Sequence, residues 1–253
     1  MFERLAQRLR AYAERDGRGY PDWAVRYVPV VRRLQQEGRL TGRPIEIGAN
    51  ENGLARFAGM RTVVVDAAFE HLRAARATQD VLPVVADITA LPFRDGAADV
   101  CVCVDTLEHV PAGSRQPAVA EVLRIVGAAG TAVLAFPSGR KAAQAESSVR
   151  NAYVRWTGRN LKWLEEHAAE GLPSPGALAA LVRVEAGDRK RLDVTGNANL
   201  RVWRWMWLVL LCGWPGRGNA VFQALLRFFT PILCRMHFGT CYRTVLWVEP
   251  KDV

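Results

Sequence analysis

The sequence predicts an α/β protein built on a doubly wound, mostly parallel, seven-stranded β-sheet with helices on both faces. Three observations support this fold class. Short runs rich in Val and Ile recur from residue 44 to residue 136, as in strands that are buried on both faces. Helix-like stretches alternate with these runs, and such alternation forms parallel sheets through right-handed crossovers. An acidic residue lies at or just after the end of each of the first four runs.

The expected strands follow one another in chain order. The first five are the apolar runs at residues 44–47, 62–65, 82–86, 100–104 and 131–136. Residues 190–194 are expected to form a sixth strand, and the sequence YRTVLWV at residues 242–248 a seventh.

The expected domain organisation has two parts. Residues 1–40 show two stretches of helical periodicity and are predicted to form an N-terminal helical cap. Residues 41–253 are expected to form one larger domain, because a chain of this length with half of its residues apolar can bury one substantial core. Within it, residues 161–169 and 175–184 are expected to be helical, and about residues 197–239 form a helical insertion between the last two strands.

The cysteines and the first residues bear on localisation. Five cysteines, an odd number, lie in apolar runs without a C-x-x-C pair, which favours reduced thiols in a cytoplasmic protein. No Cys/His cluster has the spacing of metal ligands, so no metal site is expected. Residues 1–10 mix charged and apolar side chains, unlike a signal peptide, so export is not expected.

The positive charge is concentrated in the later part of the chain. Arg and Lys outnumber Asp and Glu by only 17 to 16 through Ala135, but by 17 to 9 from Phe136 onward. Such an excess is typical of a surface that meets an anionic partner, although an Arg-rich genome produces the same bias without function. Both interpretations stay open.

Four acidic residues are expected to meet at one edge of the sheet. Glu46, Asp66, Asp87 and Asp105 lie at or directly after the ends of the first four strands, where doubly wound sheets bind their ligands. Their mutual repulsion favours a ligand that is cationic or rich in hydrogen-bond donors. Taken singly, Asp66 and Asp87 have an equally good interpretation as residues that cap the following helix or turn.

The turn after the first strand reads EIGANENG and differs from a dinucleotide-binding turn. Gly48 and Gly53 fit the outer positions of G-x-G-x-x-G, but Asn50 replaces the middle glycine, which lets the backbone approach a pyrophosphate. A nucleotide-dependent dehydrogenase is therefore disfavoured. Asn tolerates left-handed backbone conformations, so a tight turn is still expected here.

The ordered motifs resemble a known family. The runs EIGANENGLARF, VVVD, ADITALPF and ADVCVCVDTLEHVP, between about Pro44 and Pro137, resemble the class I S-adenosylmethionine-dependent methyltransferases, particularly the ubiquinone-biosynthesis-like, or type 11, group. The resemblance implies a Rossmann-like methyltransferase fold whose last strand is antiparallel. It also implies S-adenosylmethionine as the cofactor, which has no phosphate, carries a sulfonium and an ammonium, and presents two ribose hydroxyls.

The resemblance also implies a role for individual residues. Glu46, Gly48, Ala49 and Asn50 would hold the methionine part of the cofactor, although Asn50 and Asn52 stand where the family usually has glycine. The ribose hydroxyls would bind at Asp66, next to Ala67, and the adenine would lie between Asp87 and Ile88. The path to the methyl group would be lined by Asp105, Thr106 and Leu107.

His109 is a weaker candidate for a direct role in the reaction. It lies just beyond the fourth strand, and an imidazole titrates near neutral pH, as a general base requires. A Glu-His pair recurs at this place in the family as a structural feature, so a structural role is the favoured interpretation. Methyl transfer depends on alignment of nucleophile and sulfonium more than on one acid or base.

Two apolar segments of the insertion suggest the kind of acceptor. Residues 201–214 contain four tryptophans, yet their apolar run is shorter than the roughly 20 residues that span a bilayer. Residues 220–234 predict an amphipathic helix whose polar face carries Gln223, Arg227 and Thr230. The segments are expected either to lie peripherally on the inner face of a membrane or to cap a substrate pocket. Nucleic acid is not expected, because the aromatic residues cluster with aliphatic ones.

These patterns predict methyl transfer to a small-molecule, lipid or lipid-linked sugar acceptor, at an oxygen atom. The alternative is a catalytically silent domain of the same fold that docks on a membrane or on a protein partner.

Overall fold

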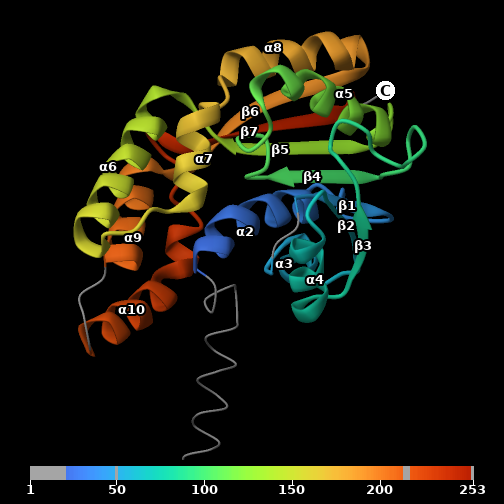
Figure 1. The fold of residues 1–253 in the computed structure, drawn as a ribbon. Helices are drawn as coiled ribbons and strands as arrows, with labels where there is room; N and C mark the ends of the chain where they lie inside the picture. Colours follow the sequence, from blue (N-terminus) through green and yellow to red (C-terminus); the bar gives the residue numbers. More distant parts are fainter. Residues whose placement is uncertain (1–20, 49–50, 213–216, 252–253) are drawn as a thin grey trace, which may run out of the picture.

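A computed structural model describes residues 21–48, 51–212 and 217–251 of the chain (Figure 1). The strands are β1 (Pro44–Ile47), β2 (Thr62–Asp66), β3 (Val81–Val85), β4 (Val100–Val104), β5 (Thr131–Pro137), β6 (Lys190–Asn199) and β7 (Cys241–Pro250). The α-helices are α2 (Pro21–Gln36), α3 (Leu54–Ala58), α4 (Phe69–Thr78), α5 (Arg115–Val126), α6 (Gly139–Thr157), α7 (Lys162–Glu170), α8 (Pro175–Ala186), α9 (Leu200–Cys212) and α10 (Arg217–Leu233). The short 3₁₀ helices η2 (Ala112–Ser114) and η3 (Gly187–Arg189) complete the set.

All seven strands belong to one sheet with the order β3-β2-β1-β4-β5-β7-β6. The pairs among β1 to β5 are parallel, whereas β7 pairs antiparallel with both β5 and β6. The predicted fold class, including the antiparallel last strand, is confirmed. Strand order reverses between β1 and β4, which is where such sheets bind ligands.

The central strands are buried on both faces because alternate residues point to opposite sides. In β4, Cys101 and Cys103 pack in a core cluster that α5 and α8 cover. Val100, Val102 and Val104 point the other way, into a cluster that α2 and α3 cover. Figure 1 shows these two pairs of helices on opposite sides of the sheet. This arrangement explains why the strands are continuous apolar runs rather than alternating ones.

The helices that follow β5 and β6 form a third core cluster beyond the sheet. Trp203 of α9 stacks on Tyr242 of β7 with ring centroids 3.7 Å apart, and Val149 of α6 and Leu164 of α7 complete this core. The sequence did not predict α6. The first predicted helix of the N-terminal cap lies outside the described residues, and α2 is the second. None of the helices in the described ranges is both long and apolar enough to cross a bilayer.

Candidate functional site

The predicted acidic residues share one edge of the sheet. In the parallel register, Ile47 at the end of β1 pairs with Val65 of β2 on one side and with Cys103 of β4 on the other. Asp66 pairs with Val85 at the end of β3. The segments that follow these strands therefore emerge on the same edge, at the reversal of strand order.

Glu46 is a buried carboxylate at the centre of this edge. Its Oε2 accepts a hydrogen bond from the Leu54 amide at 2.9 Å, which anchors the start of α3. The Tyr27 hydroxyl lies within hydrogen-bonding reach of this carboxylate, although neither it nor Oε1 has a well-aligned partner among the described residues. Burial raises the pKa of Glu46 to about 7, so the group is poised between its acid and its carboxylate form at neutral pH.

The turn after β1 is packed tightly against the neighbouring loop. Gly48 has φ of 89°, and a Cβ there would lie 2.1 Å from Thr106 Oγ1. A Cβ at Gly53 would lie 2.4 Å from Glu46 Oε2. The two glycines thus let the backbone pass close to Glu46 and Thr106. Ala49 and Asn50 lie outside the described residues, whereas Asn52 is buried.

Replacing Gly48 with alanine is expected to destabilise this turn by more than the conformational strain alone. The new Cβ would meet the left-handed backbone penalty, about 1–2 kcal/mol, and also the Thr106 hydroxyl. Gly139→Ala is the matched control, because Gly139 has φ of 81° but no atom within 4 Å of a Cβ. Chemical denaturation measures both variants. Equal losses of stability would contradict the packing described here.

The acidic residues after β2 and β3 form local turns. Asp66 Oδ1 accepts from the Ala68 amide at 2.7 Å and lies 3.3 Å from His71 Nδ1, and Ala67 beside it is exposed. Asp87 is exposed, and hydrogen bonds from the Thr89 hydroxyl and amide lower its pKa. Both carboxylates thus organise their own loops, as the capping interpretation expects, and both remain at the predicted edge. Ile88 is half-buried against the core.

Asp105 is held by two arginines from distant parts of the chain. Arg243 of β7 donates to both carboxylate oxygens at 2.6 Å, and Arg26 of α2 lies 3.0 Å away. Burial favours the neutral acid, but the charges of Arg243 and then Arg26 bring the pKa of Asp105 below its ordinary value. The repulsion from which a cationic or donor-rich ligand was expected is therefore already offset at Asp105. The protein itself supplies the cations.

The residues directly after Asp105 have different surroundings. Asp105 has φ of 51°, a left-handed conformation that is strained for a residue with a Cβ. The Thr106 hydroxyl donates to the Ile47 carbonyl at 3.0 Å and so ties the loop after β4 to the end of β1. Leu107 is fully buried in the core, so its side chain does not line an open path to the methyl group as predicted. Its side chain instead anchors the loop after β4 to the core.

The match to a protein family identifies the domain to which this edge belongs. Residues 45–134, which hold β1 to β5 and the loops described above, match the model of the methyltransferase domain family. The chain is a class I S-adenosylmethionine-dependent methyltransferase. No curated protein matches the sequence of this methyltransferase at a significant level.

Solved structures agree with this methyltransferase in fold. A S-adenosylmethionine-dependent methyltransferase from Archaeoglobus fulgidus is 11% identical, with a TM-score of 0.52 over 87% of this chain and 92% of that one. The YcgJ protein from Bacillus subtilis is 14% identical, with a TM-score of 0.51 over 88% and 99%. The [4+2]-cyclase SpnF is 15% identical, with a TM-score of 0.52 over 88% and 81%. Because a cyclase shares the fold, the family match rather than the shape identifies the activity.

The residues at the edge fit the cofactor. S-adenosylmethionine supplies a methyl group that is activated by its sulfonium. The buried Oε1 of Glu46, without a well-aligned partner in the described part of the chain, fits the ammonium end of the cofactor. The close backbone at Gly53, where a Cβ would lie 2.6 Å from Oε1, leaves this oxygen uncovered by a Cβ atom. A buried carboxylate oxygen thus lies next to the turn in which asparagines replace the usual glycines.

His109 belongs to a second polar cluster of the methyltransferase, next to the loop after β4. Its Nδ1 lies 3.0 Å from Glu166 Oε2 of α7, and its Nε2 lies 3.4 Å from His167 Nε2. Burial, followed by the nearby His167, lowers the pKa of His109. Glu108 is completely buried, and this burial and then the charge of Asp105 raise its pKa well above the ordinary value. Whether His109 acts in the reaction stays a prediction.

Four polar residues of these clusters were not found from the sequence. They are Arg26, Glu146, His167 and Arg243. Arg243 had a signal, because it is a charged residue inside an otherwise apolar strand and such a residue needs a buried partner. Glu146 and His167 had none, since each lies on an ordinary amphipathic helix.

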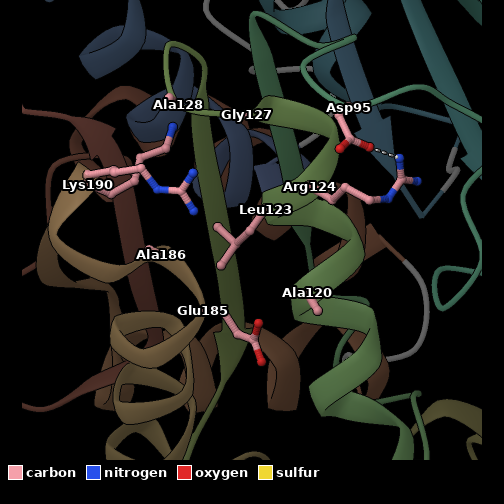
Figure 2. Close-up of a pocket in the computed structure, with 10 residues that line it drawn as sticks. Asp95, Ala120, Leu123, Arg124, Gly127, Ala128, Glu185, Ala186 and Lys190 are labelled. Atoms are coloured by element: carbon pink, nitrogen blue, oxygen red, sulfur yellow. Dashed lines mark hydrogen bonds and ion pairs between the residues drawn. The ribbon is translucent and has the colours of Figure 1, made fainter.

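Figure 2 shows a pocket of about 380 Å³ at the opposite edge of the sheet. Asp95, Arg124 and Lys190 line it, near the amino ends of β4, β5 and β6, and Asp95 pairs with Arg124 at 2.9 Å. Burial lowers the pKa of Lys190 to about 8, and its ammonium donates to the Gly130 carbonyl. Its place at the amino ends of the strands separates this pocket from the cofactor edge.

Proposed function

We propose that this methyltransferase transfers the methyl group to an oxygen atom of a lipid or lipid-linked acceptor that it meets at an anionic membrane surface. Oxygen is proposed because hydroxyl groups are the common nucleophiles of lipid headgroups and lipid-linked sugars. The observation that carries the membrane assignment is an exposed aromatic and aliphatic surface on the helical insertion.

The exposed apolar side chains of the insertion, called the insertion face here, include four at the spacing of one face of α10, at residues 225, 228, 229 and 232, with one more on α9 and one after α10. They are Trp205, Leu225, Phe228, Phe229, Ile232 and Phe238, and each is between 44% and 63% exposed. Apolar residues scattered singly over a surface need no explanation, but a set gathered on one short insertion is typical of an interaction surface.

Exposed arginines accompany the insertion face. Arg201 and Arg204 lie on α9, Arg227 lies on α10, and Arg235 follows α10. Aromatic side chains with arginines beside them suit the headgroup layer of an anionic bilayer, where rings enter the acyl boundary and guanidinium groups stay among phosphates. Part of the positive charge of the later part of the chain thus lies beside the exposed apolar side chains, and this supports a lipid partner.

One residue of the predicted polar face of α10 lies against the core. Thr230, expected on a solvent-facing polar side, is fully buried, and its hydroxyl donates to the Leu226 carbonyl at 2.9 Å. Phe228 and Phe229, which lie on the predicted apolar face, are exposed. The side chain of Gln223 lies outside those described. Because a threonine satisfies its hydroxyl within its own helix, it can face the core while the aromatic residues face outward.

At the cofactor edge we propose the following roles for the predicted residues. Glu46 accepts a hydrogen bond from the ammonium of the methionine part, and the backbone near Gly48 lies along that part of the cofactor. Asp66, at the end of β2, accepts from the ribose hydroxyls, and the loop of Asp87 and Ile88 flanks the adenine. Alignment of the acceptor oxygen with the bound methyl group then supplies most of the rate.

Vesicle flotation tests the membrane assignment. The chain is expected to float with phosphatidylglycerol vesicles at low salt and less at high salt, because the arginine contribution is screened. The double variant Phe228→Glu/Phe229→Glu is expected to reduce the bound fraction at least tenfold, since it removes two aromatic rings that would insert. Phe69→Glu on α4 is the matched control, because Phe69 is equally exposed but lies far from the insertion face in sequence and fold.

The acceptor class is tested with the same vesicles. Total lipid extract is incorporated into them, the chain and radiolabelled S-adenosylmethionine are added, and labelled lipid is identified by mass spectrometry. An O-methylated lipid supports the proposal. Equal flotation of all three proteins, or label transfer only to water-soluble molecules, would overturn it.

A further inference from the structure

A cluster of three potential ligands lies beside the loop that follows β4. Glu108 and His109 belong to this loop, and His167 belongs to α7. One ligand atom from each of them lies within 4.8 Å of the others. The cluster is separate from the residues to which a role in cofactor binding is proposed above. It escaped the sequence because 58 residues separate the two histidines.

Each histidine is oriented by a carboxylate on the far side of its ring. His109 Nδ1 lies 3.0 Å from Glu166 Oε2, and His167 Nδ1 lies 3.0 Å from Glu146 Oε1. A carboxylate accepts hydrogen bonds, so each Nδ1 carries the hydrogen and each Nε2 of the neutral ring presents a lone pair. The Tyr242 hydroxyl donates to the same oxygen of Glu146 at 2.5 Å and fixes it further. Carboxylate–histidine pairs of this kind support metal-bound histidines.

The two Nε2 atoms face each other at the separation that a shared metal ion requires. They lie 3.4 Å apart. Nitrogen ligands at about 2.0–2.1 Å from a tetrahedral Zn²⁺ ion are roughly 3.3–3.4 Å apart. Two facing lone pairs repel each other unless a cation lies between them. The spacing therefore matches two adjacent corners of a tetrahedral site.

Glu108 provides an independent observation that points to a ligand. Its side chain is completely buried, and neither carboxylate oxygen has a hydrogen-bond partner among the described residues. Oε1 lies 4.0 Å from His167 Nε2, too far for a hydrogen bond but within about 1 Å of a ligand separation. A buried carboxyl without a partner is costly, and a cation between Glu108 and the histidines would offset that cost.

We propose that Glu108, His109 and His167 bind a divalent first-row transition-metal ion, with Zn²⁺ as the best match. Two imidazoles and one carboxylate suit Zn²⁺ and similar ions, whereas Mg²⁺ and Ca²⁺ prefer oxygen ligands. His109 is 36% exposed on its side chain, so solvent reaches the cluster from the His109 side. A site with three protein ligands and one open position binds water or a substrate oxygen.

The site lies on the same edge of the sheet as the cofactor residues. If the proposed oxygen acceptor is correct, on which this role rests, the ion would bind that hydroxyl and lower its pKa, so that its proton passes to water. The oxygen would then form a bond to the methyl carbon as the bond from that carbon to the sulfonium breaks, and S-adenosylhomocysteine would leave as a neutral thioether. Metal binding itself does not depend on the acceptor. It is therefore measured without acceptor or cofactor, so that its failure is distinguishable from failure of the proposed function.

Titration of the full chain with Co²⁺, after removal of bound metal with a chelator, tests the site. We expect one equivalent to bind with the intense visible absorption of a tetrahedral Co²⁺ ion, and Zn²⁺ to displace it. Glu108→Gln and His109→Gln are each expected to weaken binding at least tenfold. Glu166→Gln, which removes only the support of His109, is expected to weaken binding about tenfold.

His237→Gln is the matched control, because His237 is a histidine outside the cluster that bonds the Cys234 carbonyl. It is expected to bind Co²⁺ like the unaltered chain, and thermal unfolding of the metal-free proteins confirms that every variant is folded. Absence of the visible bands in the unaltered chain would overturn the proposal without any variant. Binding that withstands Glu108→Gln or His109→Gln would overturn it as well.

Discussion

Replacing Asp105 with alanine is expected to lower the free energy of unfolding by about 3–5 kcal/mol. Arg243 is 2% exposed and donates to both oxygens of Asp105, and Arg26 is close to the same carboxylate. The substitution leaves these buried guanidinium groups facing each other without their shared anion. Chemical denaturation followed by circular dichroism measures the loss, with the denaturant slope checked for constancy.

Asp99→Ala is the matched control for this ion pair. Asp99 also holds an arginine through two bonds, from Arg43 Nε and Nη2 at 3.1 Å, but both side chains are largely exposed. Water screens an exposed pair, so its removal is expected to change stability several times less. If Asp105→Ala loses no more free energy of unfolding than Asp99→Ala, the buried ion pair stabilises the fold no more than an exposed one.

The pH dependence of stability follows from the same contact. The folded-state pKa of Asp105 is lowered, so the unfolded chain binds the proton more readily below about pH 4. The contribution of Asp105 is therefore fully present at neutral pH and is lost as pH falls through the folded-state value. In the Asp105→Ala variant, this part of the acid sensitivity is expected to disappear.

The sheet and its ligand edge were predictable from the sequence because both depend on local patterns. Runs of Val and Ile identify strands that are buried on both faces, and parallel strands bring the residues after their ends to one edge. Glu46, Asp66, Asp87 and Asp105 therefore lie where expected. The pattern does not predict the protonation state or the bonding partners of each carboxylate, because these depend on its neighbours in space.

The residues that were missed are those joined by tertiary contacts over long stretches of chain. Arg243 is 138 residues from Asp105, and the local sequence around each residue does not predict that the two form an ion pair. The burial of Thr230 was missed for a related reason. Periodicity distinguishes two faces of a helix, but Thr230 satisfies its own hydroxyl, so polarity alone did not show which face is covered.

Cofactor affinity is expected to weaken about tenfold between pH 7.5 and pH 6 because of Glu46. Burial raises its pKa to about 7, so below that value the protein must release a proton before the carboxylate can accept the ammonium of the cofactor. Glu46→Gln is expected to bind about tenfold to a hundredfold more weakly at pH 7.5, since a charged hydrogen bond contributes roughly 1.5–3 kcal/mol, and to lose the pH dependence. Calorimetry with S-adenosylhomocysteine, which keeps the ammonium and does not react, measures both.

The stability of the cofactor-free chain separates this role from damage to the fold. Because the folded-state pKa of Glu46 is raised, the folded protein binds the proton more tightly, and stability falls between about pH 4.5 and pH 7 by roughly 3 kcal/mol. Glu46→Gln removes that cost, so at pH 7.5 the variant is expected to be at least as stable as the unaltered chain while binding cofactor worse. Glu51→Gln, an exposed glutamate in the same turn, is the matched control for both measurements. Cofactor affinity that is unchanged in Glu46→Gln would remove this carboxylate from the site.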